Sequence, residues 1–129
     1  MKVVKDCHHV LYKRYKYGAK HRKLSWKLSA KEFFGMITGR CFYCGQMPGK
    51  KVSRWNHGKK RVDVITYNGI DRINSKLGYF FENCVSSCWV CNQMKRDYDI
   101  DFFLRHVARI SHERDLGGEY QDIFGKITP

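Results

Sequence analysis

Four of the six cysteines are arranged in two Cys-x-x-Cys pairs, Cys41 with Cys44 and Cys88 with Cys91. Thiolates are good ligands for Zn²⁺, and a two-residue spacer lets both members of a pair bind one ion from a single turn. The first residues of the chain carry charges and histidines where a secretory signal would need an apolar stretch, which favours zinc over disulfides. The alternative is two chance pairs of redox or free thiols. The spacing predicts a closed, structural four-cysteine zinc site with no position left for water.

A second set of polar residues lies between and just after these pairs. Asp71 belongs to the run YNGIDRIN, and Asn92 directly follows the last cysteine of the second pair. One carboxylate and one amide oxygen can hold a hard divalent cation and leave positions open for phosphate and water. Such a cation stabilises the charge that develops when a phosphodiester is hydrolysed. Either residue alone would sooner be a turn carboxylate or a capping amide, so this hypothesis depends on their joint spacing.

These features, in this order, resemble the HNH (ββα-metal) endonuclease family, and in particular its phage-like members. The resemblance runs from about Tyr17 to Arg109 and includes the lead-in YKYGAKHRKLSWKLSAKEFFGMITGRCFYCG. The family implies a two-stranded hairpin and a following helix that grip one Mg²⁺ or Mn²⁺ ion. It also implies hydrolysis of DNA by water, leaving a 5′-phosphate and a 3′-hydroxyl.

The resemblance assigns roles to particular residues. Asp71 on the first strand and Asn92 on the helix would hold the catalytic cation. Asn83 would match the middle residue of the motif, whose amide ties down a loop and orients the first strand. Lys95 would match a basic residue that faces phosphate.

Arg72 departs from the family pattern, because most members have a histidine after the metal-binding aspartate. A guanidinium stays protonated at physiological pH, so Arg72 cannot be the general base, although it can bind the scissile phosphate. The loss of a general base typically costs roughly 10²- to 10⁴-fold in rate. Tyr79, Tyr67 and His57 are candidate replacements, and loss of a proton from metal-bound water to solvent is an equal alternative.

The charge of the chain favours a polyanionic partner. Lys and Arg number 25 against 12 Asp and Glu, which gives a net charge of +13. Phosphate contacts from such residues give affinity and salt sensitivity rather than sequence choice. We expect DNA as the partner, with RNA not excluded. The residues expected to contact it are Arg72, Lys76, Lys95, Arg96, Lys59, Lys60 and Arg61.

Two aromatic features have open readings. Residues 7–27 are densely basic and aromatic, and form either a helix across a phosphate backbone or a solvated face whose tyrosines pack on the protein. Trp26, Trp55 and Trp89 are able to stack on bases, but core packing is the expected role of at least two of them.

The elements that position these groups follow from local signals. Ser29 and Glu32 form a capping box that starts a helix from Ala30 to about Thr38, with Phe33, Phe34 and Ile37 buried. Residues 46–60 are expected to be a loop, 61–73 one strand or two broken near Asn68, and 84–87 a second strand. Helices are expected over 88–97 and 99–114. The second of these places Phe102, Phe103, Val107 and Ile110 at helical spacing, which predicts a core-facing stripe.

At 129 residues the chain is long enough for one domain. We expect an α+β fold with a small ββα-metal core, a structural four-cysteine zinc site and flanking helices. Residues 1–28 would be a basic N-terminal segment, 29–98 the zinc-stapled core, and 99–129 a C-terminal helix and tail. No apolar run approaches the length of a membrane span, so we expect an intracellular protein of a bacterial or virus-infected cell.

Three functions fit these features. The leading hypothesis is a metal-dependent endonuclease that nicks DNA, since cutting both strands would need a dimer or two sequential events. The first alternative is a non-catalytic, zinc-dependent nucleic-acid-binding module that lost activity when histidine was replaced by arginine. The second is a structural or interaction protein whose basic face binds an acidic partner. Asp71 and Asn92 favour the enzyme, because a binding module has no need of an open cation site.

Overall fold

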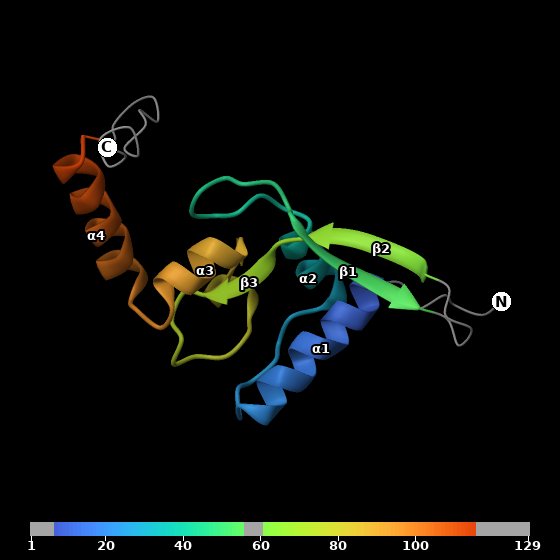
Figure 1. The fold of residues 1–129 in the computed structure, drawn as a ribbon. Coiled ribbons are helices and arrows are strands. Elements are labelled where there is room, and N and C mark those ends of the chain that lie inside the picture. The colour runs from blue at the N-terminus through green and yellow to red at the C-terminus, as the bar shows by residue number, and fades with distance from the viewer. Residues whose placement is uncertain (1–6, 56–60, 116–129) are drawn as a thin grey trace.

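The computed structural model describes residues 7–55 and 61–115, without the side chains of residues 52–55 and 61–63. Two helices, the four strands of two small antiparallel sheets and two further helices follow one another along this part of the chain (Figure 1), which confirms the expected α+β class. In chain order the elements are α1 (Cys7–His21), α2 (Ala30–Ile37), β1 (Lys50–Trp55), β2 (Arg61–Tyr67), β3 (Gly69–Arg72), the 3₁₀ turn η1 (Phe81–Asn83), β4 (Cys84–Ser87), α3 (Trp89–Lys95) and α4 (Ile100–Glu113).

The ββα unit consists of β3, β4 and α3. Strand β3 pairs antiparallel with β4, with Gly69 opposite Ser87 and Asp71 opposite Val85. Helix α3 begins one residue after β4 ends, with Cys88 as its N-cap. The hairpin and the helix that follows it confirm the predicted core, and they place Asp71 on the first strand and Asn92 on the helix.

Asn68 breaks the segment from residue 61 to residue 73 into two strands, as the sequence predicted. Its buried side-chain amide donates hydrogen bonds to the carbonyl oxygens of Gly39 (3.0 Å) and Gln46 (3.1 Å), and its backbone N–H donates to Ile37 O at 2.8 Å. These bonds tie the junction of β2 and β3 to the end of α2 and to the turn that contains the first cysteine pair. The chain can therefore leave one sheet and enter the other at Asn68.

The prediction of a loop over residues 46–60 was wrong for residues 50–55. Lys50–Trp55 forms β1, which pairs with β2 from Lys50 opposite Tyr67 to Trp55 opposite Arg61. The segment KKVSRW has little apolar alternation, so its strand structure depends on the partner strand rather than on local propensity. The connection at residues 56–60 lies outside the described residues.

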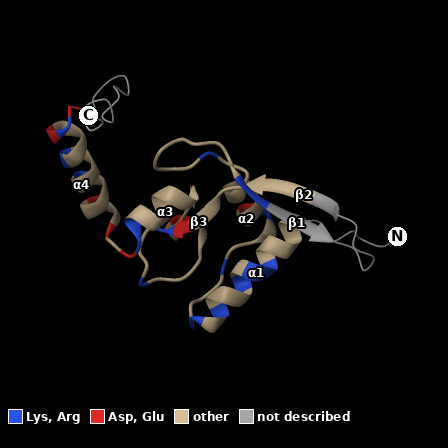
Figure 2. Cartoon of the chain, viewed as in Figure 1, with Lys and Arg blue, Asp and Glu red and all other residues tan. Residues whose placement is uncertain are grey.

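The core is formed where α1 and α2 pack together. Leu11, Phe33 and Ile37 are fully buried there, and the capping box of α2 is present as predicted. Phe34 is only half-buried. Helix α1 fits the second reading of its segment, because Tyr12 and Tyr15 pack against the core while its Lys and Arg side chains are exposed. Figure 2 shows where these basic residues lie along the helix. Contact with a phosphate backbone stays a prediction.

Helix α4 contradicts the predicted core stripe. Phe103 is buried, but Phe102 (54% exposed), Val107 (36%) and Ile110 (48%) are not. The helix projects away from the rest of the protein after its first turn (Figure 1), so most of its apolar face has no packing partner within the described chain. The amphipathic pattern predicted a helix correctly and its burial incorrectly.

None of the helices in the described ranges is both long and apolar enough to span a bilayer.

Candidate functional site

The four paired cysteines come together in one cluster, here called the cysteine cluster. Cys41 and Cys44 lie in the turn after α2, and Cys88 and Cys91 lie at the start of α3. Their four Sγ atoms are all within 4.8 Å of one another, and the Cys44 and Cys88 sulfurs are 3.7 Å apart. Tetrahedral Zn–S bonds of about 2.3 Å place sulfur atoms about 3.8 Å apart, so the cluster fits zinc. Gly45 closes the first turn with a φ of +76°, which favours glycine.

The two remaining cysteines lie outside this cluster. Cys7 and Cys84 are buried and form no disulfide. Burial raises the pKa of the Cys84 thiol to about 11, so this thiol is neutral at physiological pH.

The carboxylate of Asp71 is held through a single oxygen. Its Oδ2 accepts a hydrogen bond of 2.6 Å from the Tyr43 hydroxyl and pairs with Lys95 Nζ at 3.1 Å. Within the described ranges no hydrogen-bond or ion-pair partner contacts Oδ1. Burial and the bond to Asp71 raise the pKa of Tyr43, so its hydroxyl is a neutral donor. Oδ1 is therefore the oxygen that is available for a further contact.

The expectation that Lys95 faces phosphate is not met. Its side chain is fully buried, and Nζ donates to the carbonyl oxygen of Arg72 at 3.1 Å in addition to its pairing with Asp71. The last turn of α3 directs Lys95 back onto β3, where a buried ammonium needs these acceptors. Lys95 therefore balances the Asp71 charge from within the protein.

Asp71, Arg72 and Asn92 line one cavity of about 320 Å³, here called the Asp71 cavity. It lies between β3, the loop after β3, and α3. The Asp71 side chain is buried in its wall, whereas Asn92 is half-buried and its side chain has no hydrogen-bond partner among the described residues. The remaining lining residues are Arg22, Ile70, Ser75, Tyr79, Gln93, Arg96 and Asp97.

Arg72 is anchored at the edge of this cavity. Its Nη1 donates to the carbonyl oxygens of Ser75 and Leu77, both at 2.6 Å, and its guanidinium lies 5.3 Å from the centre of the Tyr79 ring. These contacts fix the guanidinium against the loop between β3 and β4. Arg72 is thus attached to this loop through its side chain.

Asn83 does not line the cavity but holds that same loop. Its Oδ1 accepts from the backbone N–H of Asn74 at 2.9 Å, and its Nδ2 donates to Asn74 O (3.1 Å) and Gly78 O (2.9 Å). The side chain is buried, so the three bonds are shielded from water.

Arg22 is a cavity residue that the sequence did not single out. Its Nη2 donates to the Tyr79 hydroxyl at 2.8 Å, across 57 positions of the chain. The segments that carry Arg22 and Tyr79 lie close together, and the Tyr79 N–H donates to the carbonyl oxygen of Ser25 at 2.8 Å. This close packing requires glycine at position 78, because a Cβ there would lie 2.5 Å from the same oxygen. No spacing rule links such distant positions, so only the basic character of residues 7–27 hinted at Arg22.

Arg96 also lines the cavity, from the end of α3, in an uncommon backbone conformation. Its φ is +52° and its ψ −126°, a region that L-residues seldom occupy. Lys76 is exposed on the loop and does not line the cavity. His57, Lys59 and Lys60 fall outside the described residues, as does the side chain of Arg61.

A curated protein and a solved structure are similar to this chain. No protein-family model matches the chain. It is 33% identical over 93 residues to the uncharacterized protein R423 of Acanthamoeba polyphaga mimivirus, a match that covers 72% of this chain. The chain spans only 15% of the length of that relative.

A solved structure provides the second comparison. The rare-cutting HNH restriction endonuclease PacI is similar with a TM-score of 0.56 and 18% identity, over 84% of this chain and 82% of that one. The chain therefore has an HNH-like fold, with a cysteine cluster that can bind zinc.

Proposed function

We propose that this chain is an HNH-type, metal-dependent endonuclease that hydrolyses DNA phosphodiester bonds and nicks one strand at a time. The observation that carries the proposal is the Asp71 cavity, where one carboxylate and one amide with free oxygen ligands meet a guanidinium. The likeness to a restriction endonuclease supports DNA as the substrate.

The residues present suit a hard cation. Asp71 through Oδ1 and Asn92 through its amide oxygen would hold Mg²⁺ or Mn²⁺, since both are oxygen ligands and the cavity leaves room for more. A cation bound there supplies charge stabilisation to the phosphate and the leaving oxygen. Zinc in the cysteine cluster would be structural, because four thiolates complete its tetrahedral coordination.

The chain's own side chains would bind and orient the phosphate. Arg22, Arg72 and Arg96 bring three guanidinium groups to the wall of the cavity, and guanidinium groups match phosphate oxygens in charge and geometry. Tyr43 and Lys95 hold the Asp71 carboxylate, so its free oxygen keeps one direction. Contacts of this kind lower the activation barrier because they hold the reacting groups in the right geometry.

Of the three candidate bases, Tyr79 is the one that lines the Asp71 cavity. Tyr67 is buried and lines a different cavity, and His57 lies outside the described residues. The hydrogen bond from Arg22 holds the Tyr79 hydroxyl in a fixed place. We therefore propose that Tyr79 accepts the proton of the attacking water as a phenolate, after its hydroxyl has released its own proton to solvent and with Arg22 donating to the charged oxygen.

The test is cleavage of supercoiled plasmid by the wild-type protein and by an Asp71→Ala, Asn92→Ala double variant, in Mg²⁺, in Mn²⁺ and without either cation. We expect cation-dependent nicking by the wild type and none by the double variant. Asp101→Ala is the matched control, because it removes an exposed carboxylate on α4 that does not line the cavity. Zinc content and circular dichroism establish that all variants are folded.

A second candidate function is a non-catalytic, zinc-dependent nucleic-acid-binding module. The anchoring of Arg72 to two loop carbonyls favours it, because that position then serves the loop rather than the reaction. It predicts that the wild type and the double variant bind DNA equally and that neither cuts with any cation. That result would contradict the endonuclease proposal.

A further inference from the structure

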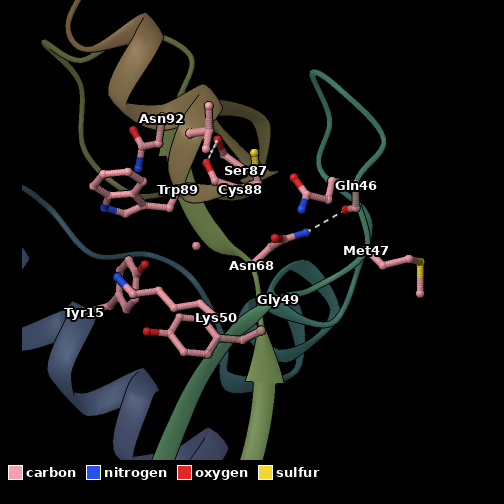
Figure 3. Close-up of a pocket in the computed structure, with 13 residues that line it drawn as sticks. Tyr15, Gln46, Met47, Gly49, Lys50, Asn68, Ser87, Cys88, Trp89 and Asn92 are labelled. Atoms are coloured by element: carbon pink, nitrogen blue, oxygen red, sulfur yellow. Dashed lines mark hydrogen bonds between the residues drawn. The ribbon is translucent and has the colours of Figure 1, made fainter. Parts of the chain in front are cut away.

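A second cavity adjoins the Asp71 cavity through Asn92, which lines both. It has a volume of about 400 Å³, within the range of ligand pockets of about 300–1,000 Å³. Figure 3 shows its arrangement: Trp89 and Asn92 from α3 lie on one side, and Tyr15 from α1 and Lys50 from β1 lie on the other. We call it the Trp89 groove.

The Trp89 side chain is exposed and does not contribute to the core. It is the first residue of α3, its side chain is 60% exposed, and within the described ranges no other ring packs against it. Trp26 packs against the core and Trp89 does not, and because the Trp55 side chain is not described, the expectation that at least two tryptophans are core residues stays a prediction. An exposed indole beside a cavity offers a flat face on which a base can stack.

The rest of the groove suits a nucleobase joined to phosphate. Its lining combines the aromatic rings of Tyr15, Tyr67 and Trp89 with the polar amides of Asn68 and Asn92, and it contains no Asp or Glu. Lys50 supplies an exposed positive charge on the wall opposite Trp89. Flat apolar faces with polar edges and one cation match a base and its neighbouring phosphate, whereas a purely apolar ligand would leave the Asn92 amide unpaired.

We propose that the Trp89 groove binds one unpaired base of the same DNA strand whose phosphate lies in the Asp71 cavity, with Trp89 stacked on the base and Lys50 near the adjoining phosphate. The inference rests on the proposed function for its choice of ligand. Because a base inside a duplex cannot reach this groove, the protein prefers single-stranded or locally unpaired DNA, and unpaired positions determine where it acts.

The test measures binding by fluorescence anisotropy without added Mg²⁺ or Mn²⁺, so that no cleavage is needed. Three labelled DNAs are compared: a fully paired duplex, the same duplex with one unpaired base, and that duplex with an abasic nucleotide at the unpaired position. The proteins are the wild type, Trp89→Ala, Trp89→Phe and the control Tyr98→Ala, which removes an exposed aromatic ring outside both cavities.

We expect the wild type to bind the unpaired-base duplex most tightly. Trp89→Ala should weaken that binding roughly 5- to 150-fold, as the loss of one base stack does, and should bind the abasic duplex as the wild type does. Trp89→Phe should retain most of the affinity, and Tyr98→Ala all of it. Zinc content shows that each variant is folded.

Two results would overturn the inference. Equal loss of affinity by Trp89→Ala for all three DNAs would mean that the indole contacts something other than an unpaired base. No loss for any of them, or no binding by the wild type, would mean that the groove holds no base. Failure of the endonuclease proposal is distinct, because it would appear as Trp89-dependent binding with no cleavage in any cation.

Discussion

The Asp71 carboxylate is where the two candidate metal sites meet. Tyr43 lies between Cys41 and Cys44 in the chain, and its hydroxyl donates to Asp71 Oδ2 at 2.6 Å. The turn that carries half of the cysteine cluster therefore also sets the orientation of the carboxylate. A partner that orients a ligand commonly affects metal affinity about 10- to 100-fold when removed.

We expect Tyr43→Phe to raise the Mg²⁺ or Mn²⁺ concentration needed for half-maximal nicking by about 10-fold or more. The change removes the hydroxyl but keeps the ring, whose contact with Phe103 has a centroid distance of 5.6 Å. The measurement is the nicking rate against cation concentration, with zinc content unchanged. Phe42→Leu, at the exposed neighbouring position, is the control. Identical cation dependence in Tyr43→Phe and wild type would show that Lys95 alone positions the carboxylate.

Tyr79→Phe tests the assignment of the base. We expect its nicking rate to fall roughly 10²- to 10⁴-fold, because the variant lacks the phenolate oxygen that would take the proton, while its DNA binding stays at the wild-type level. Rates at saturating Mn²⁺ across a range of pH make the measurement, and Tyr17→Phe, on the exposed side of α1, is the control. A Tyr79→Phe variant that nicks at the wild-type rate would assign the proton to solvent.

Elements encoded by adjacent residues could be predicted, and those that depend on distant partners could not. The capping box of α2, the break at Asn68 and the hairpin with its helix all carry local signals in the chain. Strand β1 exists because β2 pairs with it, and the inward direction of Lys95 depends on β3. The contacts of Tyr43 with Asp71 and of Arg22 with Tyr79 join segments that no spacing rule connects.

Helix α4 gives a prediction at this scale. A Val107→Ser, Ile110→Ser double variant should change the free energy of unfolding by no more than about 0.5 kcal/mol per site, because both side chains are exposed. Phe103→Ala should cost about 3–5 kcal/mol, because Phe103 is buried against Tyr43. Urea unfolding of zinc-loaded protein measures both. A loss of several kcal/mol in the double variant would show that the outer face of α4 is covered in solution.

For the whole molecule, the cysteine cluster joins segments that lie far apart in sequence. It connects the end of α2 to the start of α3 across the 43 residues that separate Cys44 from Cys88, and those residues include both hairpins. A metal bound there acts as a cross-link between the N-terminal helices and the ββα unit. The free energy of zinc binding then contributes directly to the stability of the fold.

We expect removal of zinc to unfold the ββα unit and to abolish DNA binding together with nicking. The measurement is circular dichroism and DNA affinity during titration with a zinc chelator, followed by recovery on adding Zn²⁺ back. Cys41→Ser should behave as the zinc-depleted protein, whereas Cys7→Ser, a buried cysteine outside the cluster, is the control for loss of a thiol. A folded, DNA-binding protein after zinc removal would contradict the structural role of the cluster.

The backbone at Arg96 shows that stability of the fold competes with the placement of a charged side chain at the candidate site. A non-glycine residue with φ of +52° and ψ of −126° costs of order 1–3 kcal/mol, and glycine would adopt the same geometry with little strain. Glycine would, however, take away one of the three guanidinium groups at the wall of the Asp71 cavity. The fold is therefore less stable with Arg96 than it would be with glycine, and this loss of stability falls at a residue that lines the Asp71 cavity.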